Sequence, residues 1–145
     1  MTGSRTEKGA SMVKPFYLHS VIDKVYRMAN LAKASAKVCA NKGAAEVDKL
    51  TVEAWRTNEA ANLRQPHGEL YADTYRSQPV RRVYIPKPGT NKQRPLGIPA
   101  LVERVCQQAV LQVLQPTFEE LFFEGSYGFR PGRSTHTAKE AILKY

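Results

Sequence analysis

The stretch RRVYIPKPGTNKQRPLGIP, residues 81–99, decides the fold of this chain. β-Branched and aromatic residues alternate along it before the polar run PGTNK, and apolar residues return after that run. This pattern predicts two antiparallel strands joined by a turn. Pro86, Pro95 and Pro99 have no N–H group to donate to a strand ladder. The hairpin is therefore expected to project from the protein and not to lie inside a larger sheet.

The residues before the hairpin predict helices. Apolar residues recur at three- and four-residue steps from residue 18 to about residue 39, which predicts one amphipathic helix. Thr51 is the expected N-cap of a short helix that directs Trp55 inward. The polar segment 57–71 contains Pro66 and is expected to be a second short helix or a loop.

The residues after the hairpin predict another helix at 102–114, whose apolar residues form one stripe while Glu103 and Gln112 are among those that face away. Pro116 is expected to end this helix. A turn of helix, the loop SYGFRPGRS at 126–134 and a last helix follow. The sequence thus predicts an α+β, mostly helical module with a projecting antiparallel β-hairpin.

Length and charge limit the number of domains and the kinds of partner. The 145 residues suffice for one domain, with a polar tail at 1–14 and structure from residue 15 to residue 145. Lys and Arg total 22 against 13 acidic residues, for a net charge of +9. This excess favours a polyanionic partner, nucleic acid first, although a basic protein that is merely well dissolved carries the same charge.

The cysteines and apolar segments indicate a compartment. Cys39 and Cys106 stand alone, without a partner at metal-ligand or redox spacing. The polar opening residues contain no secretory signal, and no apolar run approaches the ~20 residues that span a bilayer. These features predict a cytoplasmic protein without a membrane partner.

The hairpin concentrates positive charge. No acidic residue occurs in the segment 81–94. Guanidinium and ammonium groups at a hairpin tip suit a triphosphate or a nucleic-acid backbone. Charged edge strands also keep hairpins from pairing with one another, and the spacing alone does not separate these two interpretations. The cations of this segment are Arg81, Arg82, Lys87, Lys92 and Arg94.

The loop 126–134 mixes Tyr127 and Phe129 with Arg130 and Arg133, a combination typical of segments that contact RNA. Phe129 is the exception, because it is expected to anchor the loop to the core. The histidines lack the partners of a catalytic triad, and the sequence has no Walker motif and no metal-ligand spacing. No catalytic or metal-binding residue is therefore assigned.

These motifs carry a resemblance. The run from Pro79 to Ala138, in which RRVYIPK and RPLGIP precede SYGFRPGRS, resembles the fingers region of group II intron reverse transcriptases and maturases. Residues 41–51, NKGAAEVDKLT, resemble the amino-terminal loop of that family, except that charged Glu46 and Lys49 stand where glycine is usual.

The resemblance implies roles for individual residues. Lys87 and Arg94 would bind the triphosphate of the incoming nucleotide. Leu96, Gly97, Ile98 and Pro99 would form the surface under the templating base. Template or intron RNA would be held by Arg81, Arg82, Lys92, Arg130 and Arg133.

The resemblance also implies what this chain leaves out. In that family, magnesium is held by palm aspartates that follow the SYGFRPGRS block, whereas Asp23, Asp48 and Asp73 all precede the hairpin. The string Tyr71-Ala72-Asp73-Thr74 is expected to be a helix end and not a catalytic motif. No cofactor and no catalysis are expected from this chain alone, and magnesium is expected only of a full-length enzyme with palm and thumb.

Three interpretations stay open. The chain is the fingers part of an RNA-directed DNA polymerase, or a stand-alone maturase-like RNA-binding module, or an inactive truncated remnant. RNA and nucleotide triphosphate are the expected ligands. A homodimer is also expected, because apolar surface that would contact a palm is exposed without one, and exposed apolar surface favours self-association.

Overall fold

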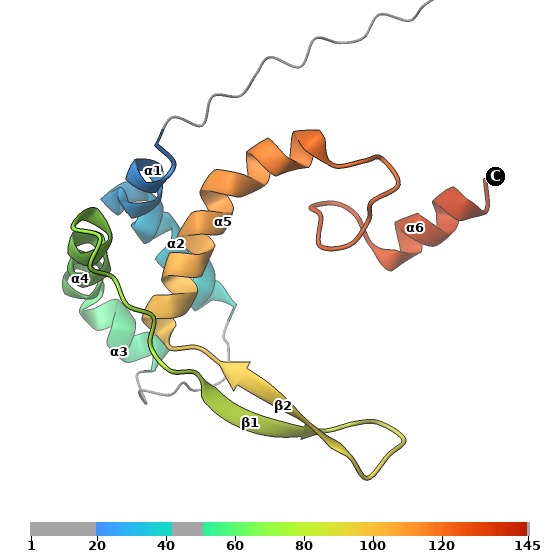
Figure 1. The fold of residues 1–145 in the computed structure, drawn as a ribbon, viewed down its shortest axis with the longest axis horizontal. Helices are drawn as coiled ribbons and strands as arrows, with labels where there is room; N and C mark the ends of the chain where they lie inside the picture. Colours follow the sequence, from blue (N-terminus) through green and yellow to red (C-terminus); the bar gives the residue numbers. More distant parts are fainter. Residues whose placement is uncertain (1–19, 42–50, 145) are drawn as a thin grey trace, which may run out of the picture.

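The computed structural model describes residues 20–41 and 51–144. These residues form an α+β structure that is mostly helical and carries one projecting hairpin (Figure 1), as predicted. The predictions for the tail at 1–14 and for the loop with Glu46 and Lys49 lie outside the described residues. The elements are α1 (Ile22–Tyr26), α2 (Met28–Ala40), α3 (Val52–Thr57), α4 (Glu59–Tyr71), β1 (Arg81–Pro86), β2 (Gln93–Ile98), α5 (Leu101–Leu121) and α6 (Thr135–Ile142).

The first predicted helix is interrupted at Arg27. This residue has φ −51° and ψ 130°, an extended conformation that separates α1 from α2. The side-chain amide of Asn30 donates to the carbonyl of Val25 at 3.0 Å and so satisfies a group that the break leaves without its helical partner. The prediction of one continuous helix was wrong because a local side-chain hydrogen bond replaces the helical one.

The core lies between α2 and α5, which cross in contact with each other. Leu31 and Ala34 of α2 and Val105 and Ala109 of α5 have no exposed surface. Polar bonds fix the same crossing, because the Gln112 side chain donates to the Asn30 side-chain oxygen at 2.9 Å. Gln112 therefore faces the helix pair and not solvent, which corrects the prediction for this residue.

The single tryptophan ties three helices together. Trp55 of α3 is 3% exposed, and its indole N–H donates to the hydroxyl of Ser35 on α2 at 2.9 Å. The same hydroxyl donates to Glu59 at the start of α4. Thr51 caps α3 as predicted, since its side chain accepts from the N–H of Ala54 at 3.2 Å.

Two prolines lie inside helices. Pro66 is fully buried within α4, so segment 57–71 is largely helical. Pro116 lies inside α5, and the prediction that it ends the helix was wrong. A proline removes one helical hydrogen bond and costs about 3 kcal/mol. Burial of Thr117 and the ion pair of Glu119 with Arg130 hold the turns beyond Pro116 in place.

The hairpin is a two-stranded antiparallel sheet that extends away from the helices (Figure 1), as predicted. Arg81 pairs with Ile98 at its base and Pro86 with Gln93 near its tip. The opposite end of α5 leads into the loop and α6, whose N-terminus has a capping box between Ser134 and Thr137.

Candidate nucleic-acid interface

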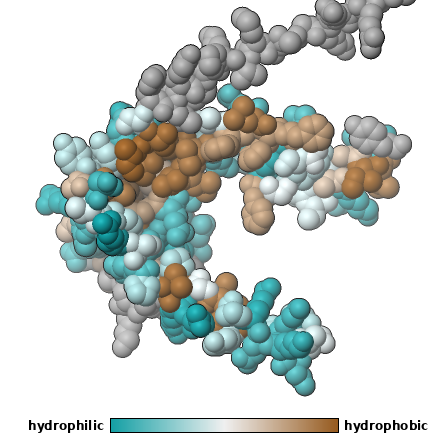
Figure 2. Space-filling model, in the orientation of Figure 1, coloured by the Kyte–Doolittle hydropathy of each residue, from teal (hydrophilic) through white to brown (hydrophobic). Residues whose placement is uncertain are grey.

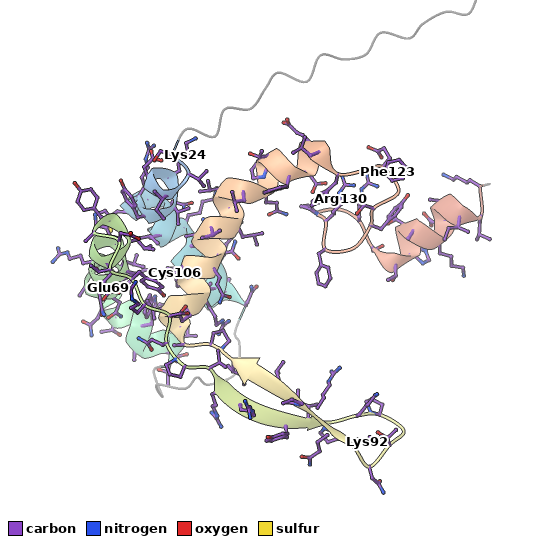
Figure 3. All side chains as sticks on the ribbon, in the orientation of Figure 1. Lys24, Glu69, Lys92, Cys106, Phe123 and Arg130 are labelled. Carbon is purple, nitrogen blue, oxygen red and sulfur yellow. The ribbon has the colours of Figure 1, made fainter. Side chains whose placement is uncertain are left out.

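The hairpin tip is a tight turn that presents lysines. Gly89 has a positive φ of 75°, and the N–H of Thr90 donates to the carbonyl of Lys87 at 3.2 Å. With proline second and glycine third, these four residues match a type II turn. The N–H of Lys87 donates to the carbonyl of Lys92 at 2.9 Å, which brings the two lysines opposite each other. Both are exposed, and Figure 3 shows Lys92 at the end of the hairpin.

The register sorts the arginines onto two faces. Arg94 pairs with Ile85, so both side chains point to the face that also carries Val83 and Leu96. Alternation along the strand sends Arg82 to the opposite face. The apolar side chains of the first face are half-buried or exposed, so Arg94 borders an apolar strip that is open to a ligand.

Four cations of the hairpin have no neutralising partner within the described residues. Arg82, Lys87, Lys92 and Arg94 are exposed and form no ion pair with any described residue. No acidic side chain occurs between residues 81 and 98. Among the described residues nothing offsets the mutual repulsion of these cations, and solvent, salt or an anionic ligand can relieve it.

The residues expected under the templating base do not share one face. Leu96 and Ile98 point with Arg94, whereas Gly97 belongs to the other face. A Cβ added at Gly97 would lie 3.1 Å from a methyl group of Val80, so the absence of a side chain lets Val80 pack on the strand. Pro99 is half-buried beside Ile98, at the base of the hairpin.

Arg130 is an internal anchor. Its side chain is 6% exposed and pairs with Glu119 of α5, with 2.8 Å between Nε and the carboxylate. The guanidinium also donates to the carbonyls of Phe123 and Ser126, each at 3.0 Å, and lies over the ring of Phe122. Its predicted contact with RNA stays a prediction, and these bonds give it a second role in folding the loop onto α5.

Arg133 lies nearer the surface. It pairs with Glu124 at 2.8 Å and stacks over the Tyr127 ring, 5.0 Å from its centroid. The hydrogen bond and charge of Arg133 lower the pKa of the Glu124 carboxyl, and the same pairing raises the pKa of Arg133. Glu124 is 89% exposed, so an incoming phosphate could replace it as the partner of Arg133.

Phe129 corrects a prediction. It has a φ of 57°, and its side chain is fully exposed. The expectation that Phe129 anchors the loop was wrong, because the neighbouring Arg130 occupies the inward position. A positive φ is rare for an aromatic residue and marks a strained loop.

The two cationic segments lie at opposite ends of α5 (Figure 1). The hairpin precedes this helix and the Arg133 loop follows it. Figure 2 shows the hairpin in mostly hydrophilic colours, and hydrophobic surface gathered on the helical part of the molecule. Exposed Leu111, Phe118 and Phe122 line one apolar groove.

The described residues do not fit a catalytic metal site. Phosphoryl transfer with two metal ions needs clustered carboxylates, and within residues 20–41 and 51–144 no three acidic, histidine or cysteine side chains are grouped so that they could hold a metal ion. Asp73 lies just past the end of α4, so the Tyr71–Thr74 string is a helix end, as expected.

One buried carboxylate was not predicted from the sequence. Glu103, expected to face solvent, is 4% exposed. It accepts hydrogen bonds from Ser77 and from the N–H of Gln78, in the segment that leads into the hairpin. Its place in the first turn of α5 was visible in the sequence, but its partners, which precede the hairpin, were not.

No family model matches the chain. Protein YkfC of Escherichia coli (strain K12) is 43% identical over 114 residues, which are 77% of this chain and 30% of YkfC. Group II intron-encoded protein LtrA of Lactococcus lactis subsp. cremoris is 48% identical over 71 residues, 49% of this chain and 12% of LtrA. Nuclear intron maturase 1, mitochondrial, of Arabidopsis thaliana is 43% identical over 44 residues, 30% of this chain and 6% of that protein.

These relatives place the chain among the group II intron reverse transcriptases and maturases. The matched residues make up less than a third of YkfC and about an eighth of LtrA. Across the part of the chain that the structure describes, no helix combines the length and the apolar character needed to cross a membrane.

Proposed function

We propose that this chain is the fingers portion of a group II intron-type RNA-directed DNA polymerase, and that it binds template or intron RNA and the incoming nucleotide triphosphate. The observation that supports this most directly is the set of exposed cations along the hairpin. Exposed Arg82, Lys87, Lys92 and Arg94 form no ion pair with a described residue, and the hairpin stands clear of the helices.

Within this proposal the residues divide their tasks. Lys87 and Arg94 bind the triphosphate, since an ammonium at the turn and a guanidinium on the adjoining strand can reach one phosphate chain together. Arg81, Arg82 and Lys92 contact the RNA backbone, with Arg133 and the loop that Arg130 anchors. The strip from Leu96 to Pro99 underlies the templating base.

The first experiment measures RNA affinity against salt. Each phosphate contact contributes about 0.7–0.9 to the slope of log K against log salt concentration. Lys92→Ala should weaken binding of a structured RNA for any sequence and reduce the slope by about 1. Lys37→Ala, which removes an exposed charge from α2, is the control and should change the slope less.

The second experiment measures nucleotide binding. Lys87→Ala and Arg94→Ala should each weaken binding of a fluorescent deoxynucleoside triphosphate to the RNA-bound chain about tenfold, the loss expected for one charge-assisted hydrogen bond. Unchanged nucleotide affinity in both variants would contradict the triphosphate role.

A stand-alone maturase-like RNA-binding module is the second candidate. The observation that favours it is the similarity to proteins named intron maturases. RNA affinity that depends on Lys92, together with nucleotide affinity that is indifferent to Lys87 and Arg94, would select this second function. If RNA affinity does not change when Lys87, Lys92 or Arg94 is replaced, the chain is the inactive remnant.

A further inference from the structure

The hairpin is joined to the helices at a small base. We use the name hairpin base for residues 77–80, which enter β1, and residues 99–100, which leave β2. Ala100 is 1% exposed and passes directly into α5. The entering side has neither helix nor strand from Ala72 to Val80, so its direction depends on individual contacts.

Glu103 supplies two of those contacts. Oε1 accepts from the N–H of Gln78 at 2.6 Å, and Oε2 accepts from the hydroxyl of Ser77 at 3.0 Å. The two carboxylate oxygens thus hold two consecutive residues of the entering segment. Among the described residues Glu103 forms no ion pair, so these donors and the N-terminal turn of α5 are what stabilise the buried charge.

Two neutral side chains lie near this carboxylate. Tyr75 precedes the hairpin base and Cys106 lies one turn further along α5 (Figure 3 labels Cys106). Burial raises the pKa of the Tyr75 hydroxyl and of the Cys106 thiol, so both stay uncharged at neutral pH. Neither group therefore places a second negative charge beside Glu103, so no repulsion opposes its bonds to Ser77 and Gln78.

The length of the hairpin magnifies any change at its base. Each strand has 6 residues. At ~3.3 Å per residue the hairpin extends about 20 Å, so a tilt of ~10° at the base moves the tip by about 3 Å. Hydrogen bonds tolerate a spread of only about 0.5 Å. The direction of the base therefore decides whether the lysines at the tip can meet a phosphate.

We propose that Glu103 is a positioning residue: by holding Ser77 and Gln78 it sets the direction in which the hairpin leaves the helices. The identity of the ligand that the hairpin tip would then bind rests on the proposed function. The direction itself is a property of this chain and can be measured without any ligand.

The test measures a distance across the hairpin base. Nitroxide labels at Thr90→Cys, on the tip, and Lys37→Cys, on α2, are both at exposed positions, whereas the native cysteines are buried. Pulsed electron paramagnetic resonance should give one narrow distance for the labelled parent. Glu103→Ala should broaden and shift the distribution, and Glu103→Gln, which keeps one oxygen for the Gln78 N–H, should largely restore it.

A second variant guards against misfolding. Gln78→Pro removes the donor N–H and leaves α5 unchanged. Ser77→Ala removes the other donor alone. Fluorescence of Trp55 reports whether the helical core still unfolds at the same denaturant concentration. A broadened distance in Gln78→Pro with an intact core supports the inference, and an unchanged narrow distance in Gln78→Pro overturns it, whether or not Glu103→Ala folds.

RNA binding separates this inference from the proposed function. Glu103→Ala should weaken RNA binding about as much as loss of a tip contact, without removing a positive charge, whereas Lys92→Ala should weaken binding and leave the label distance unchanged. If the distance broadens while Lys87, Lys92 and Arg94 variants bind normally, Glu103 positions the hairpin and the phosphate-binding function fails. If the Lys87, Lys92 and Arg94 variants bind poorly while the label distance is unchanged in the Glu103 and Gln78 variants, the phosphate-binding function stands and the positioning role of Glu103 fails.

Discussion

At the scale of single residues, Arg130 and Arg133 show that two arginines of one loop can do different work. Arg130 is enclosed by Glu119 and backbone carbonyls, whereas Arg133 pairs with the exposed Glu124. The sequence alone does not distinguish these two side chains, since both are arginines of the same loop. The difference comes from Glu119, which lies on a helix that was predicted to end before it.

Arg130→Ala should release the loop from α5. The change leaves Glu119 without its cation and the carbonyls of Phe123 and Ser126 without donors, at a cost of about 3 kcal/mol. Hydrogen–deuterium exchange of residues 126–133 should become about a hundredfold faster, while α2 keeps its protection. Arg133→Ala is the matched control and should have a smaller effect, because Glu124 is exposed. Equal effects in the two variants would contradict the anchor role.

The Arg133 pair also predicts a pH dependence. Because the pKa of Glu124 is lowered in the folded protein, the pair contributes above the ordinary carboxyl pKa and is lost as pH falls through the lowered value. Arg133→Gln should raise the Glu124 pKa toward its ordinary value, which an NMR titration of the side-chain carboxyl would detect. A titration curve unchanged by Arg133→Gln would refute the pairing.

At the scale of elements, the sequence predicted the helices and strands that follow from a local pattern of apolar and turn residues. The alternation and the PGTNK turn gave the hairpin, and the apolar stripe gave most of α5. It failed where a tertiary contact outweighs a local rule. Pro66 and Pro116 continue their helices because burial and ion pairing beyond them offset the lost bond, and Arg27 breaks a helix because the Asn30 amide satisfies the freed carbonyl.

Tertiary contacts also limit what could be predicted of the site. The cations of the hairpin can be read directly from the sequence. Their shared exposure follows from the prediction that the hairpin projects from the helices. Which face each occupies needs the register, which pairs Arg94 with Ile85. The Glu103 contacts join residues 25 and 26 positions apart, and no periodicity reveals such a bond.

Ser35→Ala tests the tie between α2, α3 and α4. The substitution leaves the buried indole N–H of Trp55 without an acceptor, which costs about 1–3 kcal/mol. Urea unfolding followed by Trp55 fluorescence should show a lower midpoint with an unchanged slope. Ala36→Ser, at the adjacent exposed position, adds a hydroxyl and should change the midpoint little. Equal midpoints for the two variants would mean that the Trp55 bond contributes nothing.

At the scale of the whole molecule, the expected homodimer stays a prediction with a definite surface. Val110, Leu111, Phe118, Phe122 and Phe129 line one apolar groove along α5, and all are exposed. Apolar area of this kind favours association when nothing else covers it. Sedimentation of the 145-residue chain should show dimers that increase with concentration, and Phe118→Glu should abolish them. Lys37→Glu is the control, and a chain that stays monomeric at all concentrations would refute the dimer.

The continuity of α5 has one more consequence. Its 21 residues correspond to about 31 Å of helix, and they join the hairpin base at one end to the loop of Arg130 and Arg133 at the other. Because Pro116 does not interrupt this helix, α5 fixes the spacing between the hairpin base and the loop. If both segments bind RNA as proposed, an RNA too short to reach from one to the other touches one segment only. Affinity should then rise in a step, and not gradually, as the RNA is lengthened past that reach.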